Sequence, residues 1–105
     1  MLRWLDNTNP SWERYDLQVV NEIIDNLGPH PVFPIHLEDC RLDGRIQLVD
    51  TTAALHRFFR KGYGWTTVQQ YYRHRHGIVL RWPNLPLVQI GNNRGRLFPI
   101  ELLEF

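Results

Sequence analysis

From residue 31 onward, the apolar residues of this chain come in short runs that glycine, proline and asparagine interrupt. Each run is long enough for a strand of roughly four to eight residues and too short for a separate helix. The runs expected to form strands are Val32–Leu37, Arg45–Val49, His56–Phe59, Ile78–Trp82, Leu87–Ile90 and Arg96–Pro99. Many short strands around one embedded helix predict a mostly β fold with some α-helix, built as a small bent barrel with a helical insertion.

The residues before this β-rich part favour a helix. Asn9 is a good capping residue, and Pro10 suits the first helical position. The apolar residues that follow share one helix face, namely Leu17, Val20, Ile24 and Leu27. Gly28 then permits a left-handed end. We therefore expect residues 1–28 to form an N-terminal helix and linker region, and residues 29–105 to form the domain proper.

A second helix is expected inside the β-rich part. Thr66 and Gln69 have the spacing of a capping box, in which a hydroxyl and a side-chain amide cover free backbone amides. The helix should run from about Thr67 to Arg75 and end at Gly77.

Three turns are expected between strands. Asp43-Gly44 favours the tight turn of a hairpin, because both residues tolerate a positive φ. This hairpin would join residues 40–42 to the strand that follows. The other two turns are Lys61–Gly64 and Asn92–Gly95.

Length and composition fit one ordinary globular domain. The 105 residues, 43% hydrophobic and 22% charged, suffice for a single core and differ in composition from disordered chains. We expect no membrane span, since the apolar runs are short, and no secretory signal in the first residues. Cys40 is the single cysteine, so a reducing compartment is the simpler expectation. We expect a cytoplasmic location, with a nuclear one left open.

Basic residues are unevenly distributed, although the net charge is only +1. No acidic residue occurs between Thr51 and Pro99. Eight of the 12 basic residues lie in this interval: Arg57, Arg60, Lys61, Arg73, Arg75, Arg81, Arg94 and Arg96. A locally basic half is a modest indication of phosphate binding, and a solvated basic face is the alternative.

Aromatic and basic residues are combined on the second expected helix. Helical spacing places Tyr71 and Arg75 one turn apart on one face, and Tyr72 and His76 on a neighbouring face. A phenol beside a guanidinium suits a phosphate, because both groups donate hydrogen bonds and those of arginine are charge-assisted. The alternative is that the two tyrosines are half-buried core residues and Arg75 faces solvent.

The stretch from Val68 to Gly91 carries the longest pattern in the chain. Its elements, in order, are Val68, Gln70-Tyr71-Tyr72, Arg75-His76, Val79-Leu80-Arg81, Trp82-Pro83-Asn84-Leu85-Pro86 and Val88-Gln89-Ile90-Gly91. In order and spacing they resemble the C-terminal half of the PAZ domain of Argonaute proteins. Arg96–Glu101 resembles the end of that domain, and Val49–Phe59 extends the likeness upstream more weakly.

The resemblance implies both a fold and a function. The fold would be a small OB-like or SH3-like bent barrel with a short insertion of a β-hairpin and an α-helix. The domain would bind the 3′ end of a small single-stranded RNA, or the 3′ overhang of a small RNA duplex, without sequence specificity, in an Argonaute protein of RNA silencing. Its partners would be the small RNA and the other domains of an Argonaute protein, and as an isolated domain it would be a monomer. We expect no membrane partner, no cofactor and no catalytic residue.

The resemblance also assigns residues to the RNA end. Tyr71 and His36 would hydrogen-bond the phosphate that joins the last two nucleotides. Arg75 and Arg94 would contact the backbone, and Phe59 would form the floor of the pocket. The full set of expected RNA-binding residues is His36, Arg45, Phe59, Tyr71, Arg75, His76 and Arg94.

The chain departs from the family in three ways, one of which is that the segment Arg60–Trp65 is shorter than the family's usual loop before the helix. His76 stands where the family usually has a second tyrosine, and it could serve the same role. Leu42 and Gly44 stand where Argonautes often have an arginine and a tyrosine that face the phosphate. Arg41 or Arg45 would compensate for the missing cation, depending on which face of the strand each occupies.

A metal site and an enzyme are weaker interpretations. His74 and His76 are two residues apart and point apart on a helix, and Cys40 with His36 lacks a second pair at finger-like spacing. No nucleophile motif, carboxylate pair or phosphate-cradling glycine loop occurs. We therefore expect neither a metal nor catalysis.

The stronger rival is a protein-interaction or spacer module whose RNA pocket has degenerated. An apolar groove for a peptide would then be formed by Trp4, Trp12, Trp65 and Trp82 with several tyrosines. Packing in the core is the simpler interpretation of each tryptophan. Competition by an RNA with a free 3′ overhang distinguishes the two functions.

Overall fold

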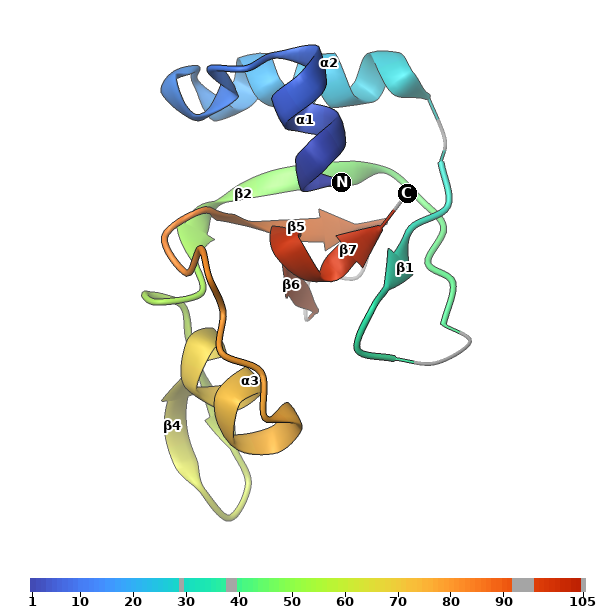
Figure 1. Cartoon of the computed structure of the whole chain (residues 1–105). Coiled ribbons are helices and arrows are strands. Elements are labelled where there is room, and N and C mark those ends of the chain that lie inside the picture. Colours follow the sequence, from blue (N-terminus) through green and yellow to red (C-terminus); the bar gives the residue numbers. More distant parts are fainter. Residues whose placement is uncertain (29, 38–39, 92–95, 105) are drawn as a thin grey trace.

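The computed structural model describes residues 1–28, 30–37, 40–91 and 96–104. Within them, no helix combines the length and apolarity that a membrane crossing requires. Hydrogen bonds group the described strands into three sheets, and every pairing is antiparallel. Figure 1 shows the N-terminal helices on one side of the central sheet and a hairpin with a helix extending away from it.

The central sheet has the strand order β2–β5–β6, and its middle strand is buried on both faces. Its strands are β2 (Ile46–Thr52), β5 (Pro86–Ile90) and β6 (Leu97–Pro99). Leu48 of β2 and Phe98 of β6 both lie opposite Val88 of β5. Val88 packs in a core with the N-terminal helices, whereas Leu87 packs on the other face with the insertion. The expected strands from residues 45, 87 and 96 are confirmed within two or three residues.

The N-terminal segments close one face of this sheet. They are α1 (Leu2–Thr8), the 3₁₀ turn η1 (Trp12–Arg14) and α2 (Leu17–Leu27). Their buried side chains Leu5, Trp12, Val20 and Ile24 join the core of the sheet. The side-chain amide of Asn21 donates to the carbonyl of Leu48 at 3.0 Å and accepts from its N–H at 2.7 Å. The first 27 residues thus pack on the same core as the strands, and a boundary at residue 28 stays a prediction.

The N-terminal helix begins later than the sequence predicts, and a further helix precedes it. Asn9 is the residue that ends α1, not the cap of a long helix, and α2 starts after Asp16. Between them Trp12 is buried, and its indole N–H donates to Asp6 at 2.9 Å. Trp12 belongs to the 3₁₀ turn η1, and Tyr15 after it is extended, so the chain does not continue as one helix from Pro10.

The insertion lies between β2 and β5 and consists of a hairpin followed by a helix. Its elements are β3 (Arg57–Arg60), β4 (Gly64–Thr67) and α3 (Val68–His76). The expected helix and its end at Gly77, which has φ of 67°, are confirmed. The capping box lies one residue later than predicted: Thr67 accepts from the Gln70 N–H, and the Gln70 side chain accepts from the Thr67 N–H. The residues Gly64–Thr67, expected as a turn and a cap, form the second strand of the hairpin.

Asp43-Gly44 does not close a hairpin, contrary to the prediction. Leu42 exchanges two backbone hydrogen bonds with Val32 instead, at 2.8 and 2.9 Å, and β2 pairs with β5. Gly44 has φ of 136°, and a Cβ there would lie 2.8 Å from the Cα of Gly91. Glycine is therefore needed at residue 44 because two backbones cross closely, not because of a tight turn.

The segment Ile78–Trp82 is not a strand in the structure, although its apolar pattern predicts one. The backbone N–H groups of Arg81 and Trp82 each donate to the carboxylate of Glu101 at 3.0 Å. This side chain is the hydrogen-bond acceptor that the backbone of a neighbouring strand would otherwise provide. Glu101 belongs to the 3₁₀ turn η2 (Ile100–Leu102). The remaining pair of strands is β1 (Phe33–Pro34) with β7 (Leu103–Glu104), and the expected turn at Asn92–Gly95 lies outside the described residues.

Candidate nucleic-acid interface

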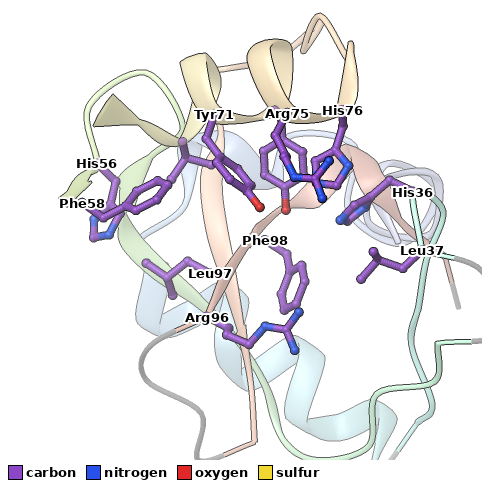
Figure 2. A pocket seen from close by; sticks show the side chains of 12 residues that line it. His36, Leu37, His56, Phe58, Tyr71, Arg75, His76, Arg96, Leu97 and Phe98 are labelled. Atoms are coloured by element: carbon purple, nitrogen blue, oxygen red, sulfur yellow. The ribbon is translucent and has the colours of Figure 1, made fainter. Parts of the chain in front are cut away.

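A cavity of about 570 Å³ lies between the insertion, β6 and the segment after β1. This volume is within the range of small-molecule sites in proteins. We call it the α3 cavity, and Figure 2 shows its side chains converging from these elements. The lining residues are His36, Leu37, His56, Phe58, Val68, Tyr71, Tyr72, Arg75, His76, Arg96, Leu97 and Phe98.

The helix α3 supplies the aromatic and cationic wall of this cavity. Tyr71 and His76 lie with ring centroids 5.6 Å apart, and Tyr72 and His76 lie 5.5 Å apart. Tyr72 is buried, and burial together with the neighbouring Tyr71 raises its pKa to about 12. Its phenol therefore stays protonated and retains a hydrogen-bond donor near neutral pH.

His36 approaches the same cluster from the opposite side. Its ring centroid is 5.0 Å from that of Tyr72 and 5.1 Å from that of His76. Its Nδ1 is buried and has no hydrogen-bond partner among the described residues. Burial lowers the pKa of His36, and the positive charges of His76 and Arg96 lower it further. A buried nitrogen without a hydrogen-bond partner destabilises the fold unless a ligand or a water molecule forms that hydrogen bond.

Two arginines face the cavity from opposite walls. Arg75 extends from α3 and Arg96 from the start of β6, with Phe98 between them in Figure 2. The Arg96 guanidinium lies 5.5 Å from the ring centroid of Phe98. Among the described residues, no carboxylate lines the cavity and neither arginine forms a salt bridge. Both guanidiniums are thus free to bind an anion.

Phe58 of β3 forms the remaining aromatic wall. Its ring packs edge-to-face on Tyr71 with centroids 5.4 Å apart. Phe59, the residue expected at the floor of the pocket, points to the other face of the hairpin, where it is 63% exposed and contacts Trp65. The structure thus brings Phe58 and not Phe59 to the cavity, because neighbouring side chains of a strand point to opposite faces.

The structure brings four of the seven expected residues to the cavity: His36, Tyr71, Arg75 and His76. Arg45 is not there, because it forms a salt bridge with Asp25 of α2 at 2.7 Å, which lowers the pKa of that carboxyl. Arg94 lies outside the described residues. The sequence reasoning missed Phe58, Tyr72 and Arg96, of which Arg96 had a signal as part of the basic interval.

A second cavity, of about 450 Å³, lies between η1, α2, β2 and the residues before β5. We call it the α2 cavity. Trp12, Tyr15 and Leu55 give it aromatic and apolar walls. Its charged lining residues are Glu13 and Asp50, and no basic residue of the described ranges lines it. No group of three or more histidine, cysteine or acidic side chains suited to a metal occurs in the described part of the chain.

Comparison with known proteins agrees with the pattern seen in the sequence. The profile of the PAZ domain family matches residues 13–105. A search of curated proteins finds no match. Among solved structures, the PAZ domain of Drosophila Argonaute 2, described as recognising the 3′ end of nucleic acids, is similar with a TM-score of 0.62 and 20% identity, over 95% of this chain and 87% of that one. The family match spans most of the sequence and the fold agrees over nearly all of it, so this chain belongs to the PAZ domain family.

Proposed function

We propose that this domain binds the 3′ end of a small single-stranded RNA, or the short 3′ overhang of an RNA duplex, without base preference. The observation that carries the proposal is the α3 cavity, which combines aromatic walls with two arginines that form no salt bridge, and which no carboxylate lines among the residues that the structure describes. Single-stranded nucleic acid is typically held by aromatic platforms and cations together. The 3′ end recognition described for the PAZ domain of Drosophila Argonaute 2 supports the same function here.

Each wall of the cavity has a chemical task in this proposal. The phenols of Tyr71 and Tyr72 donate hydrogen bonds to the phosphate that joins the last two nucleotides, and Arg75 adds charge-assisted ones. The buried Nδ1 of His36, which has no partner among the described residues, forms a hydrogen bond with the same phosphate. Phe58 packs against the terminal sugar or base. Contacts to phosphate and sugar carry no sequence information, which accounts for the lack of base preference.

The wider setting is also part of the proposal. The domain acts by binding and performs no chemistry, since a PAZ fold positions a strand end for other domains of the protein. Those partners are the remaining domains of an Argonaute protein in RNA silencing, and the isolated domain is a monomer. A cytoplasmic location fits a chain with one cysteine.

Titration of a labelled short duplex with a 3′ overhang tests the proposal. Tyr71→Ala removes a stacking platform and a phenol, so the affinity should fall by about 5- to 150-fold, as expected for losing about 1–3 kcal/mol. Arg73→Ala is the matched control, because Arg73 lies on α3, is exposed and does not line the cavity. Equal affinity of wild type and Tyr71→Ala would defeat the assignment of the cavity.

The salt dependence gives a second measure of the same contact. With about three phosphate contacts to a single strand, the slope of log affinity against log salt should be near −2. Binding that is insensitive to salt would contradict a phosphate-centred site.

A protein-interaction or spacer module remains the second candidate. The outer face of the hairpin favours it, because Phe59 and Trp65 are 63% and 72% exposed and pack edge-to-face against each other there. Large exposed aromatics of this kind often mark docking surfaces. If this is the main function, RNA ends will not bind and substitutions in the α3 cavity will have no effect on partner binding.

A further inference from the structure

The α2 cavity has acidic residues in its wall that the function proposed above does not use. Glu13 of η1 and Asp50 of β2 line it, and neither forms a salt bridge with any residue that the structure describes. Arg14, the neighbour of Glu13, is exposed and does not line the cavity. Because a cleft lined by charges of one sign concentrates the opposite charge, the cavity suits a cation.

The surrounding sequence does not offset this negative charge. Residues 1–28 contain five acidic and two basic residues. Outside the described ranges the only basic residue is Arg94, which follows β5 in the sequence. Of β5 only Pro86, the first residue of the strand, lines the cavity. An RNA phosphate would be repelled here, so the ligand of this cavity differs in class from that of the α3 cavity.

The wall that β2 gives to the cavity is irregular. Four consecutive residues, Val49 to Thr52, line it. Side chains of a regular strand alternate between two faces, so four neighbours do not ordinarily face one hollow. The register of β2 against β5 shifts between Leu48 and Thr52, as in a β-bulge. The bulge therefore opens this part of β2 to the cavity and to a ligand in it.

Thr52 adds a hydrogen-bonding group to the same wall. Its Oγ1 is buried and has no hydrogen-bond partner among the described residues, so a ligand that donates to it would stabilise it. The cavity thus offers three acceptors, the carboxylates of Glu13 and Asp50 and this hydroxyl. A guanidinium has five N–H donors in one plane, whereas an ammonium is a compact charge with three. Arginine therefore fits the set better than lysine.

Apolar side chains surround these acceptors. Tyr15 and Leu55 line the cavity and are 45% and 74% exposed. An arginine packs its methylene stem on apolar surface while its guanidinium reaches polar groups. Exposed apolar residues beside the charges favour a segment of a protein, with apolar residues next to the arginine, over a small free cation.

We propose that the α2 cavity binds an arginine side chain on an exposed segment of a protein partner. Glu13 and Asp50 pair with the guanidinium, Thr52 accepts one of its N–H groups, and Tyr15 and Leu55 contact the apolar residues beside it. A volume of about 450 Å³ has room for this side chain. The site goes beyond the RNA function and is independent of it, because no described residue lines both cavities.

Titration of the isotope-labelled protein with short capped peptides, followed by NMR, tests the site. Three peptides differ only at a central position between two leucines, which is arginine, lysine or citrulline. Citrulline has the shape of arginine without the charge. The arginine peptide should bind at least about fivefold more tightly than the citrulline peptide, as two partly exposed ion pairs allow, with lysine between them. The amide signals of Glu13 and Asp50 should shift, and those of Tyr71 and Arg75 should not.

Glu13→Gln/Asp50→Asn should remove the preference for arginine over citrulline. Both residues are exposed, so this variant should fold and bind the overhang duplex within about twofold of wild type. Glu22→Gln/Glu104→Gln is the control, because it changes the net charge equally at two exposed residues that do not line the cavity, and it should retain the preference. Thr52→Val, which keeps the shape without the hydroxyl, should weaken binding of the arginine peptide by about two- to tenfold.

Equal affinity for the arginine and citrulline peptides overturns this inference, as does an arginine preference that survives in Glu13→Gln/Asp50→Asn. Signal shifts confined to residues outside the α2 cavity, or no binding of the arginine peptide at millimolar concentration, also overturn it. Equal affinity for lysine and arginine would contradict the guanidinium preference. Binding of the RNA end is measured with a different ligand at a different cavity, so failure of either proposal leaves the other standing.

Discussion

The α3 cavity and the α2 cavity have similar volumes, about 570 and 450 Å³, and differ in charge. Both have aromatic walls. Among the described residues, Arg75, Arg96 and three histidines line the α3 cavity without a carboxylate, whereas Glu13 and Asp50 line the α2 cavity without a basic residue. Size and aromatic content therefore do not distinguish a phosphate site on this fold, and the sign of the charge does.

The difference in charge arises from two parts of the sequence. The insertion and the strands β5 and β6 lie in the interval from Thr51 to Pro99, which has no acidic residue. Both carboxylates of the α2 cavity come from residues before that interval. The two cavities can thus be tested separately, one through binding and the other through stability.

The largest effect is expected from Trp12→Ala in the wall of the α2 cavity. Trp12 is 1% exposed and donates to Asp6, so its removal leaves a void in the core and an acceptor without its donor. The free energy of unfolding should fall by about 3–5 kcal/mol, measured by urea denaturation. The folded fraction should bind RNA as wild type does, and a selective loss of RNA affinity at unchanged stability would contradict the division between the two cavities.

The pair Phe58→Ala and Phe59→Ala tests which face of the hairpin binds. Phe58 packs on Tyr71 in the α3 cavity, so its removal should weaken RNA binding by about tenfold, within the range of a lost stacking contact. Phe59 faces away and its removal should change the affinity by less than about twofold. Fluorescence anisotropy with the overhang duplex measures both affinities. A larger loss for Phe59→Ala than for Phe58→Ala would place the RNA on the outer face of the hairpin.

A smaller effect is expected from pH, with opposite signs for stability and binding. The pKa of His36 in the folded protein is lowered from its ordinary value of 6.5, so the unfolded chain takes up the proton first as the pH falls. The contribution of His36 to the free energy of unfolding is therefore fully present above about pH 6.5, and it is lost as the pH falls below that value. A bound phosphate favours protonated His36, so RNA affinity should rise over the same fall in pH until the pKa of the free protein is reached.

His36→Gln should reduce the pH dependence of both the free energy of unfolding and the RNA affinity. Denaturation and RNA titration between neutral and mildly acid pH measure the two. His76, Tyr72 and Arg96 face the same ring, so His36→Gln/His76→Gln serves as the reference without these two imidazoles. RNA affinity that is unchanged with pH in wild type would show that His36 does not contact the phosphate.

The smallest effect on RNA binding is expected from Glu13→Gln in the α2 cavity. Glu13 is exposed and lines the α2 cavity but not the α3 cavity, so the affinity for the overhang duplex should change by less than about twofold. A tenfold change would mean that the RNA path includes the α2 cavity.

The elements with strong local signals could be predicted from the sequence. The helix α3 has a capping box and a terminal glycine, and both fix its ends without help from the rest of the fold. The strand β5 is a short apolar run between a proline-rich turn and a glycine. Local chemistry decides such elements, so their prediction was close to the structure.

The elements that depend on distant partners could not be predicted. Gly44 has turn chemistry, but its backbone passes against Gly91, and the pairing of Leu42 with Val32 excludes the hairpin. The segment Ile78–Trp82 has a strand pattern, but a carboxylate 20 residues after Arg81 takes its backbone N–H groups. Neither contact leaves a mark in the local sequence.

The site shows the same division. Tyr71, Arg75 and His76 lie on one helix, so spacing alone brought them together. Phe58 and Phe59 are neighbours on a strand, and only the register of the hairpin decides which one faces the cavity. Arg45 forms a salt bridge with Asp25 of α2 and therefore does not reach the cavity. The sequence pattern did not indicate this contact, because it placed Asp25 in a region separate from the domain.

The most direct test of the central claim compares one overhang duplex with a free 3′ end and the same duplex with a bulky group on that end. If the strand terminus enters the α3 cavity, the blocked duplex should bind wild-type protein at least about tenfold more weakly at equal salt, a cost of 1.4 kcal/mol or more. Equal affinity for the free and the blocked ends would contradict an enclosed site for the terminus and leave RNA binding, if present, on an open surface of the domain.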